Sequence, residues 1–187
     1  MAISCNNQIF SLHTKHSTYQ MKVDRDFLIH TYYGPYVGDS DMSYLARCID
    51  RGFSGNPDGI TDKGYSLDTQ LLEYPSYGTG DFRNDCLRVA YADGSQVTDL
   101  KYVSHEIKEG KYGLEGLPAM YQGEENVQTL EVVLQDVYKK LEVILYYGVF
   151  ENLDVITRAC KIVNKGEDKV NLLRAYSMCL EDRKSVV

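Results

Sequence analysis

The sequence predicts an all-β domain, an antiparallel β-sandwich. Apolar and polar residues alternate with a period of two in about eight to ten short runs, which is the period of half-buried strands. Turn-forming residues separate these runs at spacings typical of sandwiches. The chain has 16 Tyr, 5 Phe and no Trp, and tyrosine suits half-buried sheet faces because its ring is apolar and its tip is polar. The length of 187 residues fits one domain, residues 1–187.

The first three predicted strands lie near the N-terminus. Residues 8–13 and 17–23 alternate apolar and polar side chains, so the apolar members of each run share one face. We expect these two runs to pair antiparallel. Residues 27–33 form a third run, which Gly34-Pro35 ends because this pair interrupts regular strand pairing.

Residues 38–84 are predicted to form a long irregular loop within the domain. The segment is rich in Asp and Gly and has only brief apolar runs. Loops longer than about 12 to 15 residues without regular structure are uncommon in compact domains and are more often functional than not, with disorder as the alternative. Apolar and aromatic residues interspersed in this segment favour an ordered loop that packs against the domain; they are Tyr44, Leu45, Ile49, Phe53, Tyr65 and Leu67.

Two β-hairpins are predicted in the second half of the chain. Asp93-Gly94 separates the alternating runs 86–91 and 96–103, and Gly accepts the positive φ that a tight hairpin turn requires. Residues 164–166 predict a second, slightly longer turn between the apolar runs 155–163 and 170–173. We therefore expect each turn to join two strands that pair with each other.

Residues 126–150 fit two periods. Val127, Leu130 and Leu134 follow a helical period of 3.6 residues, and no Gly or Pro interrupts the middle of the segment. The same region also alternates strictly in two stretches and contains many β-branched or aromatic residues. The sequence predicts two strands here, with a helix as the alternative.

Charge and hydropathy exclude two classes of partner. The formal net charge is −7, from 20 Lys and Arg against 27 Asp and Glu, and no basic stripe counters this charge, so nucleic acid is not an expected partner. No apolar run approaches the roughly 20 residues that cross a bilayer, so we expect no membrane partner. The five cysteines are scattered without a Cys-x-x-Cys pair, which favours reduced thiols and a cytoplasmic location.

Known catalytic and cofactor motifs are not found in the sequence. The four histidines form no His-x-x-x-His pair and have no carboxylate at a ligand spacing, so we expect no metal site. Neither a nucleophile elbow nor a glycine-rich phosphate loop is present. No organic cofactor is therefore expected.

Acidic and aromatic residues in the long loop are the candidates for ligand binding. An ionised carboxylate accepts hydrogen bonds from adjacent sugar hydroxyls while an aromatic ring stacks on the apolar sugar face. The candidate substrate-binding residues are Asp50, Arg51, Phe53, Tyr77, Asp81, Phe82 and Arg83. The alternative for Asp81 and Arg83 is an ion pair that stabilises the loop, and the alternative for Tyr77 and Phe82 is packing.

Several sequence motifs follow one another along the chain between Phe10 and Leu180. They include Tyr65-Ser-Leu-Asp-Thr-Gln-Leu-Leu-Glu-Tyr-Pro-Ser-Tyr-Gly-Thr-Gly-Asp-Phe-Arg, Thr129-Leu-Glu-Val-Val-Leu-Gln-Asp and Gly148-Val-Phe-Glu-Asn-Leu-Asp-Val-Ile-Thr-Arg. Together these segments resemble the N-terminal β-sandwich domain of α-galactosidases of glycoside hydrolase family 36. The resemblance implies a galactose-mutarotase-like supersandwich and strands, rather than a helix, in residues 129–150.

The resemblance also implies that this chain is the non-catalytic part of a longer enzyme. In the family the catalytic aspartates, a nucleophile and an acid/base, lie on a (β/α)8 barrel that follows the sandwich. None of the residues 1–187 corresponds to them, so we expect no catalytic residue and no activity in this chain alone. Residues 181–187 depart from the family pattern, so we expect a truncated sandwich that is incomplete at its C-terminus.

The resemblance implies a substrate and an assembly as well. The full enzyme would hydrolyse terminal α-galactosyl residues of melibiose- or raffinose-type oligosaccharides as a homotetramer. In such tetramers a loop of this domain reaches a neighbouring active site, and the aspartate that matches Asp50 binds galactose hydroxyls, with Arg51 and Phe53 shaping the loop. The alternative function is a stand-alone carbohydrate-binding or structural assembly module.

Overall fold

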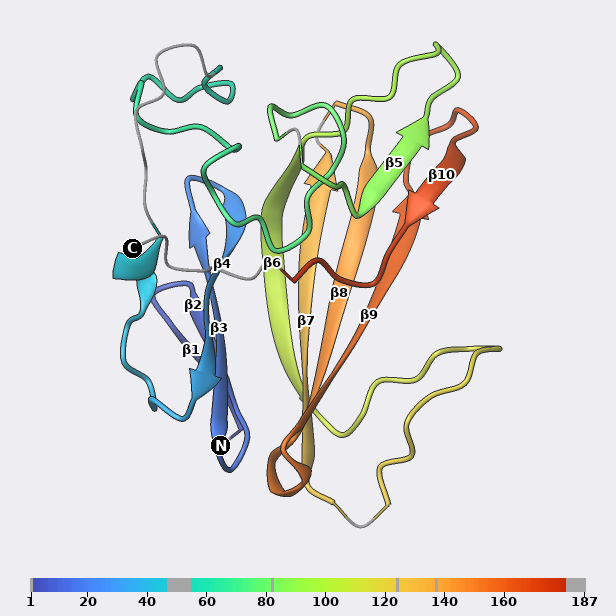
Figure 1. The fold of residues 1–187 in the computed structure, drawn as a ribbon. Helices are drawn as coiled ribbons and strands as arrows, with labels where there is room; N and C mark the ends of the chain where they lie inside the picture. Colours follow the sequence, from blue (N-terminus) through green and yellow to red (C-terminus); the bar gives the residue numbers. More distant parts are fainter. Residues whose placement is uncertain (1, 47–54, 82, 124, 137, 181–187) are drawn as a thin grey trace.

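The computed structural model describes residues 2–46, 55–81, 83–123, 125–136 and 138–180. These residues form ten strands in three antiparallel sheets, together with two short 3-10 helices (Figure 1). The predicted all-β, antiparallel fold is therefore confirmed. None of the helices in the described part of the chain is long and apolar enough to span a membrane.

The first sheet has the order β1-β2-β3-β4. Its strands are β1 (Ile3–Asn6), β2 (Ile9–His13), β3 (Ser17–Asp24) and β4 (Phe27–Pro35). Strands β2, β3 and β4 confirm the three predicted runs. However, β4 does not end before Gly34-Pro35, because these two residues still pair with the start of β3. The sequence analysis did not predict β1, because four residues are too few to show a period.

The second sheet has the order β6-β7-β8-β9. Its strands are β6 (Leu100–Glu109), β7 (Val127–Asp136), β8 (Leu141–Phe150) and β9 (Val155–Asn164). Strands β7 and β8 pair in continuous antiparallel register from Val127↔Phe150 to Asp136↔Leu141. The two strands predicted over residues 126–150 are therefore confirmed, and the helical alternative is wrong.

The pairing predicted for the two hairpins is wrong. Gly94 does adopt a positive φ of 82° in a tight turn, but β5 (Leu87–Ala90), which precedes this turn, pairs with β10 (Asn171–Ala175) in a third sheet. Strand β6 pairs instead with β7, and β10 likewise leaves β9 after the turn at residues 164–166. The long ladder between β6 and β7 offers more hydrogen bonds than a short local hairpin, so tertiary pairing overrides the turn signal.

The two four-stranded sheets pack face to face and enclose the main core (Figure 1). Phe10 on β2 lies at this interface with no exposed surface. Its ring centroid is 4.8 Å from that of His105 and 6.3 Å from that of Tyr102, both on β6. The alternation of side chains along each strand thus places one apolar face of each sheet against the other.

The long segment between β4 and β5 is irregular but packs against the first sheet. It contains the 3-10 helix η1 (Ser43–Leu45) and an isolated bridge from Leu72 to Ile29 of β4. Tyr65 and Leu67 are fully buried in a second, smaller core together with Phe27 and Ile29. These contacts bring the end of the loop back to the sheets, where it meets β5.

Candidate functional site

The candidate loop residues divide into two groups. Asp50, Arg51 and Phe53 lie in residues 47–54, outside the described residues, and Phe82 also lies outside them. Their proposed role in binding a ligand stays a prediction. The other three candidates, Tyr77, Asp81 and Arg83, lie in the turn that leads into β5.

Asp81 and Arg83 form a clamp within this turn. The carboxylate of Asp81 accepts hydrogen bonds from the Arg83 backbone N at 3.0 Å, from Nε at 2.8 Å and from Nη2 at 2.9 Å. The same Nη2 also donates to the carbonyl oxygens of Leu67 and Gln70. Because the Asp81 side chain is buried, this charge-assisted network ties two stretches of the loop together.

Tyr77 is half exposed and faces an arginine. The guanidinium of Arg88 lies 4.3 Å from the centroid of the Tyr77 ring, a cation–π contact. Arg88 is held there by Asp85, whose carboxylate also accepts a hydrogen bond from Arg174 on β10. One face of the Tyr77 ring is thus covered by a cation that a buried carboxylate positions.

A cleft of about 300 Å³ lies beside the turn that carries Tyr77 and Asp81. Residues 55–58, which directly follow the segment 47–54, form one wall, and residues 78–80, which directly precede Asp81, form another. The carboxylates of Asp58 and Asp99 line the cleft. The structure therefore brings residues 55–58 next to the turn that carries Tyr77 and Asp81.

Asp99 is the less solvated carboxylate of this cleft. Its Oδ1 is buried and has no hydrogen-bond partner among the described residues, while Lys101 Nζ lies 3.5 Å from Oδ2. Desolvation raises the pKa of Asp99, and the Lys101 charge opposes this rise.

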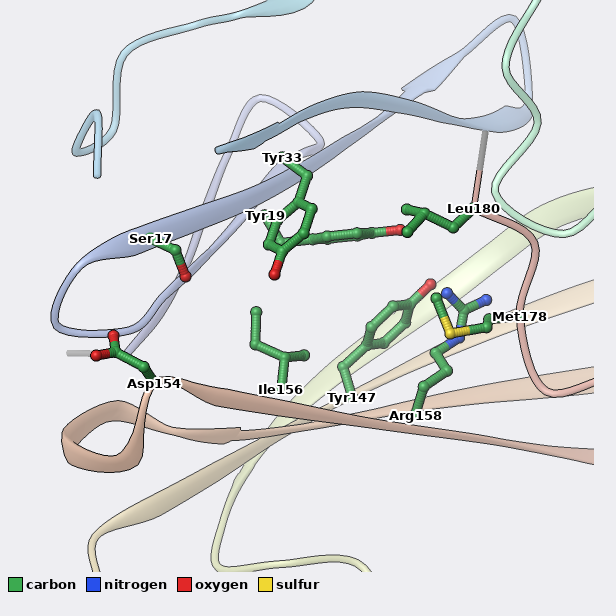
Figure 2. A pocket seen from close by; sticks show the side chains of 9 residues that line it. All are labelled: Ser17, Tyr19, Tyr33, Tyr147, Asp154, Ile156, Arg158, Met178 and Leu180. Atoms are coloured by element: carbon green, nitrogen blue, oxygen red, sulfur yellow. The ribbon is translucent and has the colours of Figure 1, made fainter. Parts of the chain in front are cut away.

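A second cavity, of about 160 Å³, lies between the two main sheets (Figure 2). Figure 2 shows Ser17 and Asp154 at one end of this cavity and Arg158 with Met178 at the other. A cavity of about 150 Å³ accommodates one six-membered ring. The described lining residues are Ser17, Tyr19, Tyr33, Tyr147, Asp154, Ile156, Arg158, Met178 and Leu180.

The residues that line the second cavity do not match the active site of a retaining glycosidase. That reaction needs two carboxyl groups about 5 Å apart across the sugar. Asp154 supplies the single carboxylate among the described lining residues. In addition, the described part of the chain contains no group of three or more His, Cys, Asp or Glu side chains that could hold a metal ion.

A buried ion pair closes the inner wall of the second cavity. Glu73, from the long loop, has no exposed surface and pairs with Arg158 of β9, whose side chain is only 7% exposed. The hydroxyl of Tyr19 donates to both Glu73 oxygens at 2.8 and 2.7 Å, and that of Tyr147 donates to Oε1 at 2.8 Å. The carboxylate thus joins the loop to β3, β8 and β9.

The tyrosines of this cluster stay protonated. Burial, followed by the negative charge of Glu73, raises the pKa of Tyr19 well above its ordinary value. Burial likewise raises the pKa of Tyr147, against the opposing charge of Arg158. Both hydroxyls therefore remain hydrogen-bond donors to Glu73 at all pH values near neutrality.

The sequence analysis did not single out Glu73. The only available signal is its position inside the apolar and aromatic run Leu71-Leu72-Glu73-Tyr74, where a carboxylate must be buried if its neighbours are. Its partner Arg158 lies 85 positions further along the chain. No local pattern indicates a pairing over such a separation.

Asp154, at the other end of the second cavity, is expected to titrate at an unusually low pH. Hydrogen bonds from His16 and Thr14 lower the pKa of Asp154 to about 2, and His16 Nδ1 lies 2.5 Å from Oδ2. Because the folded-state pKa is lowered, the stabilisation is fully present above the ordinary carboxyl pKa of 3.8 and is lost as pH falls through about 2. NMR titration of the Asp154 carboxyl carbon measures this value.

The control for this titration is the His16→Ala variant. Removal of the imidazole should move the Asp154 pKa upward toward 3.8, while the carboxyl of Asp41, which bonds to Ser43 instead, should titrate as before. An unchanged Asp154 titration in His16→Ala would contradict the assigned cause.

The sequence and the fold match one family of proteins. A sequence profile of the "Glycosyl hydrolase family 36 N-terminal domain" matches residues 26–185. The bifunctional alpha-galactosidase/sucrose kinase AgaSK of Mediterraneibacter gnavus is 48% identical over 94% of this chain and 19% of its own length. Alpha-galactosidase AgaA of Geobacillus stearothermophilus is 43% identical over 97% of this chain and 25% of its own.

Solved structures agree with this assignment. The galactosidase domain of AgaSK superposes with a TM-score of 0.91 over 96% of this chain and 25% of that chain. A variant of AgaA in complex with raffinose gives a TM-score of 0.85 at 44% identity, over 91% of this chain and 24% of that chain. The chain thus spans about a fifth to a quarter of these relatives. It belongs to the family of glycosyl hydrolase family 36 N-terminal domains.

Proposed function

We propose that this chain is the N-terminal, non-catalytic part of an α-galactosidase that releases terminal α-galactosyl residues from melibiose- or raffinose-type oligosaccharides. The observation that carries the proposal is the likeness over nearly the whole chain to enzymes named alpha-galactosidases. Relatives of known structure hold raffinose and stachyose, which are substrates of the proposed class. The hydrolysis itself takes place on a barrel domain, outside residues 1–187.

We further propose that the long loop of this domain completes the active site of another subunit in a cytoplasmic homotetramer. The structure supports this role through the clamp between Asp81 and Arg83, which holds the turn beside the cleft. Residues 55–58, at the far wall of that cleft, follow directly on the segment that contains Asp50. A rigid support of this kind presents a neighbouring loop at a defined position.

The proposal is tested in a chimera in which this chain replaces the matching N-terminal quarter of AgaA. We expect Asp50→Asn in the chimera to lower kcat/KM for raffinose by about 10- to 100-fold. The reason is that hydrogen bonds from sugar hydroxyls to a charged group contribute about 1.5–3 kcal/mol each. Steady-state kinetics with raffinose and with p-nitrophenyl α-galactoside measure the loss.

Two controls accompany this experiment. Glu115→Gln removes an acidic charge at an exposed position of a different loop and should leave kcat/KM unchanged. The purified chain alone should not hydrolyse p-nitrophenyl α-galactoside. Equal activity of the Asp50→Asn and parent chimeras would refute the loop's role, and turnover that copurifies with the isolated chain would refute the non-catalytic assignment.

A further inference from the structure

Three cysteines from distant parts of the chain gather around residues 176–179. Cys86 directly precedes β5, Cys160 lies on β9, and Cys179 lies in the segment that follows β10. The backbone N of Tyr176 donates to the carbonyl oxygen of Cys86 at 2.9 Å. The thiol of Cys160 donates to the carbonyl oxygen of Tyr176 at 3.4 Å. Both contacts hold this segment against the edge of the main core.

Cys86 and Cys179 are in direct side-chain contact. Cys86 belongs to the main core cluster, and Cys179 packs against this cluster. Cys86 is buried, with 1% of its surface exposed, whereas Cys179 is only partly buried. The hydrogen bond with Cys179, followed by burial, raises the pKa of Cys86. Because Cys179 is the more exposed residue of the two, we expect an oxidant from solvent to reach it first.

Cys160 differs from this pair in its partners. Its Sγ contacts the hydroxyl of Tyr74 at 3.5 Å in addition to the carbonyl oxygen of Tyr176. It is therefore engaged with oxygen atoms, whereas the side chain of Cys86 interacts with that of Cys179. The structure thus distinguishes one sulfur pair among three neighbouring thiols.

We propose that Cys86 and Cys179 form a reversible disulfide when the protein meets hydrogen peroxide. The thiolate of Cys179 attacks one peroxide oxygen, the O–O bond breaks, and the leaving hydroxide takes a proton to become water. The sulfur of Cys86 then attacks the resulting sulfenic acid of Cys179 and expels a second water. Two thiols and one peroxide thus give one disulfide and two waters.

The disulfide would fasten one wall of the second cavity. Met178 and Leu180, on either side of Cys179, line that cavity (Figure 2). A bond of about 2.0 Å between the sulfurs fixes residues 176–180 to the start of β5, while reduction leaves this segment held by weak contacts. The inference is independent of the proposed function, because it concerns thiols that the galactosidase reaction does not use.

Peptide mapping tests the pairing directly. Trypsin places Cys86 in residues 84–88, Cys179 in residues 175–183 and Cys160 in residues 159–161. After treatment of the folded chain with equimolar hydrogen peroxide and blocking of the remaining thiols, we expect a linked peptide of residues 84–88 and 175–183. Dithiothreitol should separate it. Linkage of either peptide to residues 159–161, or no linkage at all, would overturn the proposal.

Single substitutions supply the controls. Cys160→Ser should retain the linked peptide, and Cys86→Ser should abolish it and leave Cys179 as a sulfenic acid that dimedone labels. Because closing a long loop stabilises the folded state, peroxide should raise the Tm of the parent and of Cys160→Ser by several degrees, but not that of Cys86→Ser. A Tm increase of equal size in Cys86→Ser would also contradict the assigned pair.

Discussion

Glu73→Gln is expected to destabilise the folded chain by about 3–5 kcal/mol, because it leaves Arg158 as a buried charge without a counter-ion. Glu73 has no exposed surface, and Arg158 is 7% exposed. Solvent therefore cannot replace the lost charge. The neutral amide retains the shape of the side chain, so the loss reports the charge interaction and its hydrogen bonds rather than a new void.

Urea unfolding of the parent and variant chains measures this loss. The matched control is Glu131→Gln, which removes a carboxylate that pairs with the more exposed Lys108 at 2.8 Å and should cost no more than about 1 kcal/mol. Combining Glu73→Gln with Arg158→Met should be less harmful than Glu73→Gln alone, because the double variant contains no unpaired charge. A loss below about 1 kcal/mol in Glu73→Gln would show that water reaches the cluster.

Phe10→Ala is expected to cost about 3–5 kcal/mol, the range for removing a buried aromatic side chain from a packed core. Phe10 lies between the two main sheets and contacts His105 of β6 edge to face. Truncation removes this contact and leaves a cavity between the sheets. Urea unfolding of Phe10→Ala therefore tests whether β2 and β6 face each other in solution.

The control for Phe10→Ala is Tyr44→Ala. Tyr44 is an aromatic residue of the long loop that is 71% exposed, so its truncation should change the free energy of unfolding by no more than about 0.5 kcal/mol. Urea midpoints of both variants, at unchanged slope, give the comparison. Equal losses in the two variants would mean that the sheets do not pack as described.

The individual strands could be predicted from the sequence because each depends on local alternation. Residues 127–136 and 141–150 show that alternation together with β-branched side chains, and both form strands. The partners of the strands were harder to predict. Asp93-Gly94 correctly indicated a turn, yet turn chemistry does not determine which strand the chain pairs with next.

Prediction of the candidate site was limited in the same way. The ion pair between Asp81 and Arg83 was one of two local alternatives, since residues two positions apart in a loop readily meet, and the structure contains it at 2.8 Å. The same pair supports the turn beside the cleft, so whether Asp81 also contacts a ligand stays a prediction. Asp50 remains the principal candidate for ligand binding on the strength of the resemblance.

The sequence by itself determined the fold class, most of the strands and the family, because these depend on the short-range period of side chains and on ordered motifs. Only the tertiary structure decided that β5 pairs with β10, that Glu73 meets Arg158, and that Cys86 meets Cys179. Each of these contacts joins residues more than 80 positions apart. The free energy of these contacts comes from burial and from strand pairing between segments that are distant in the sequence. A short stretch of sequence therefore cannot predict them.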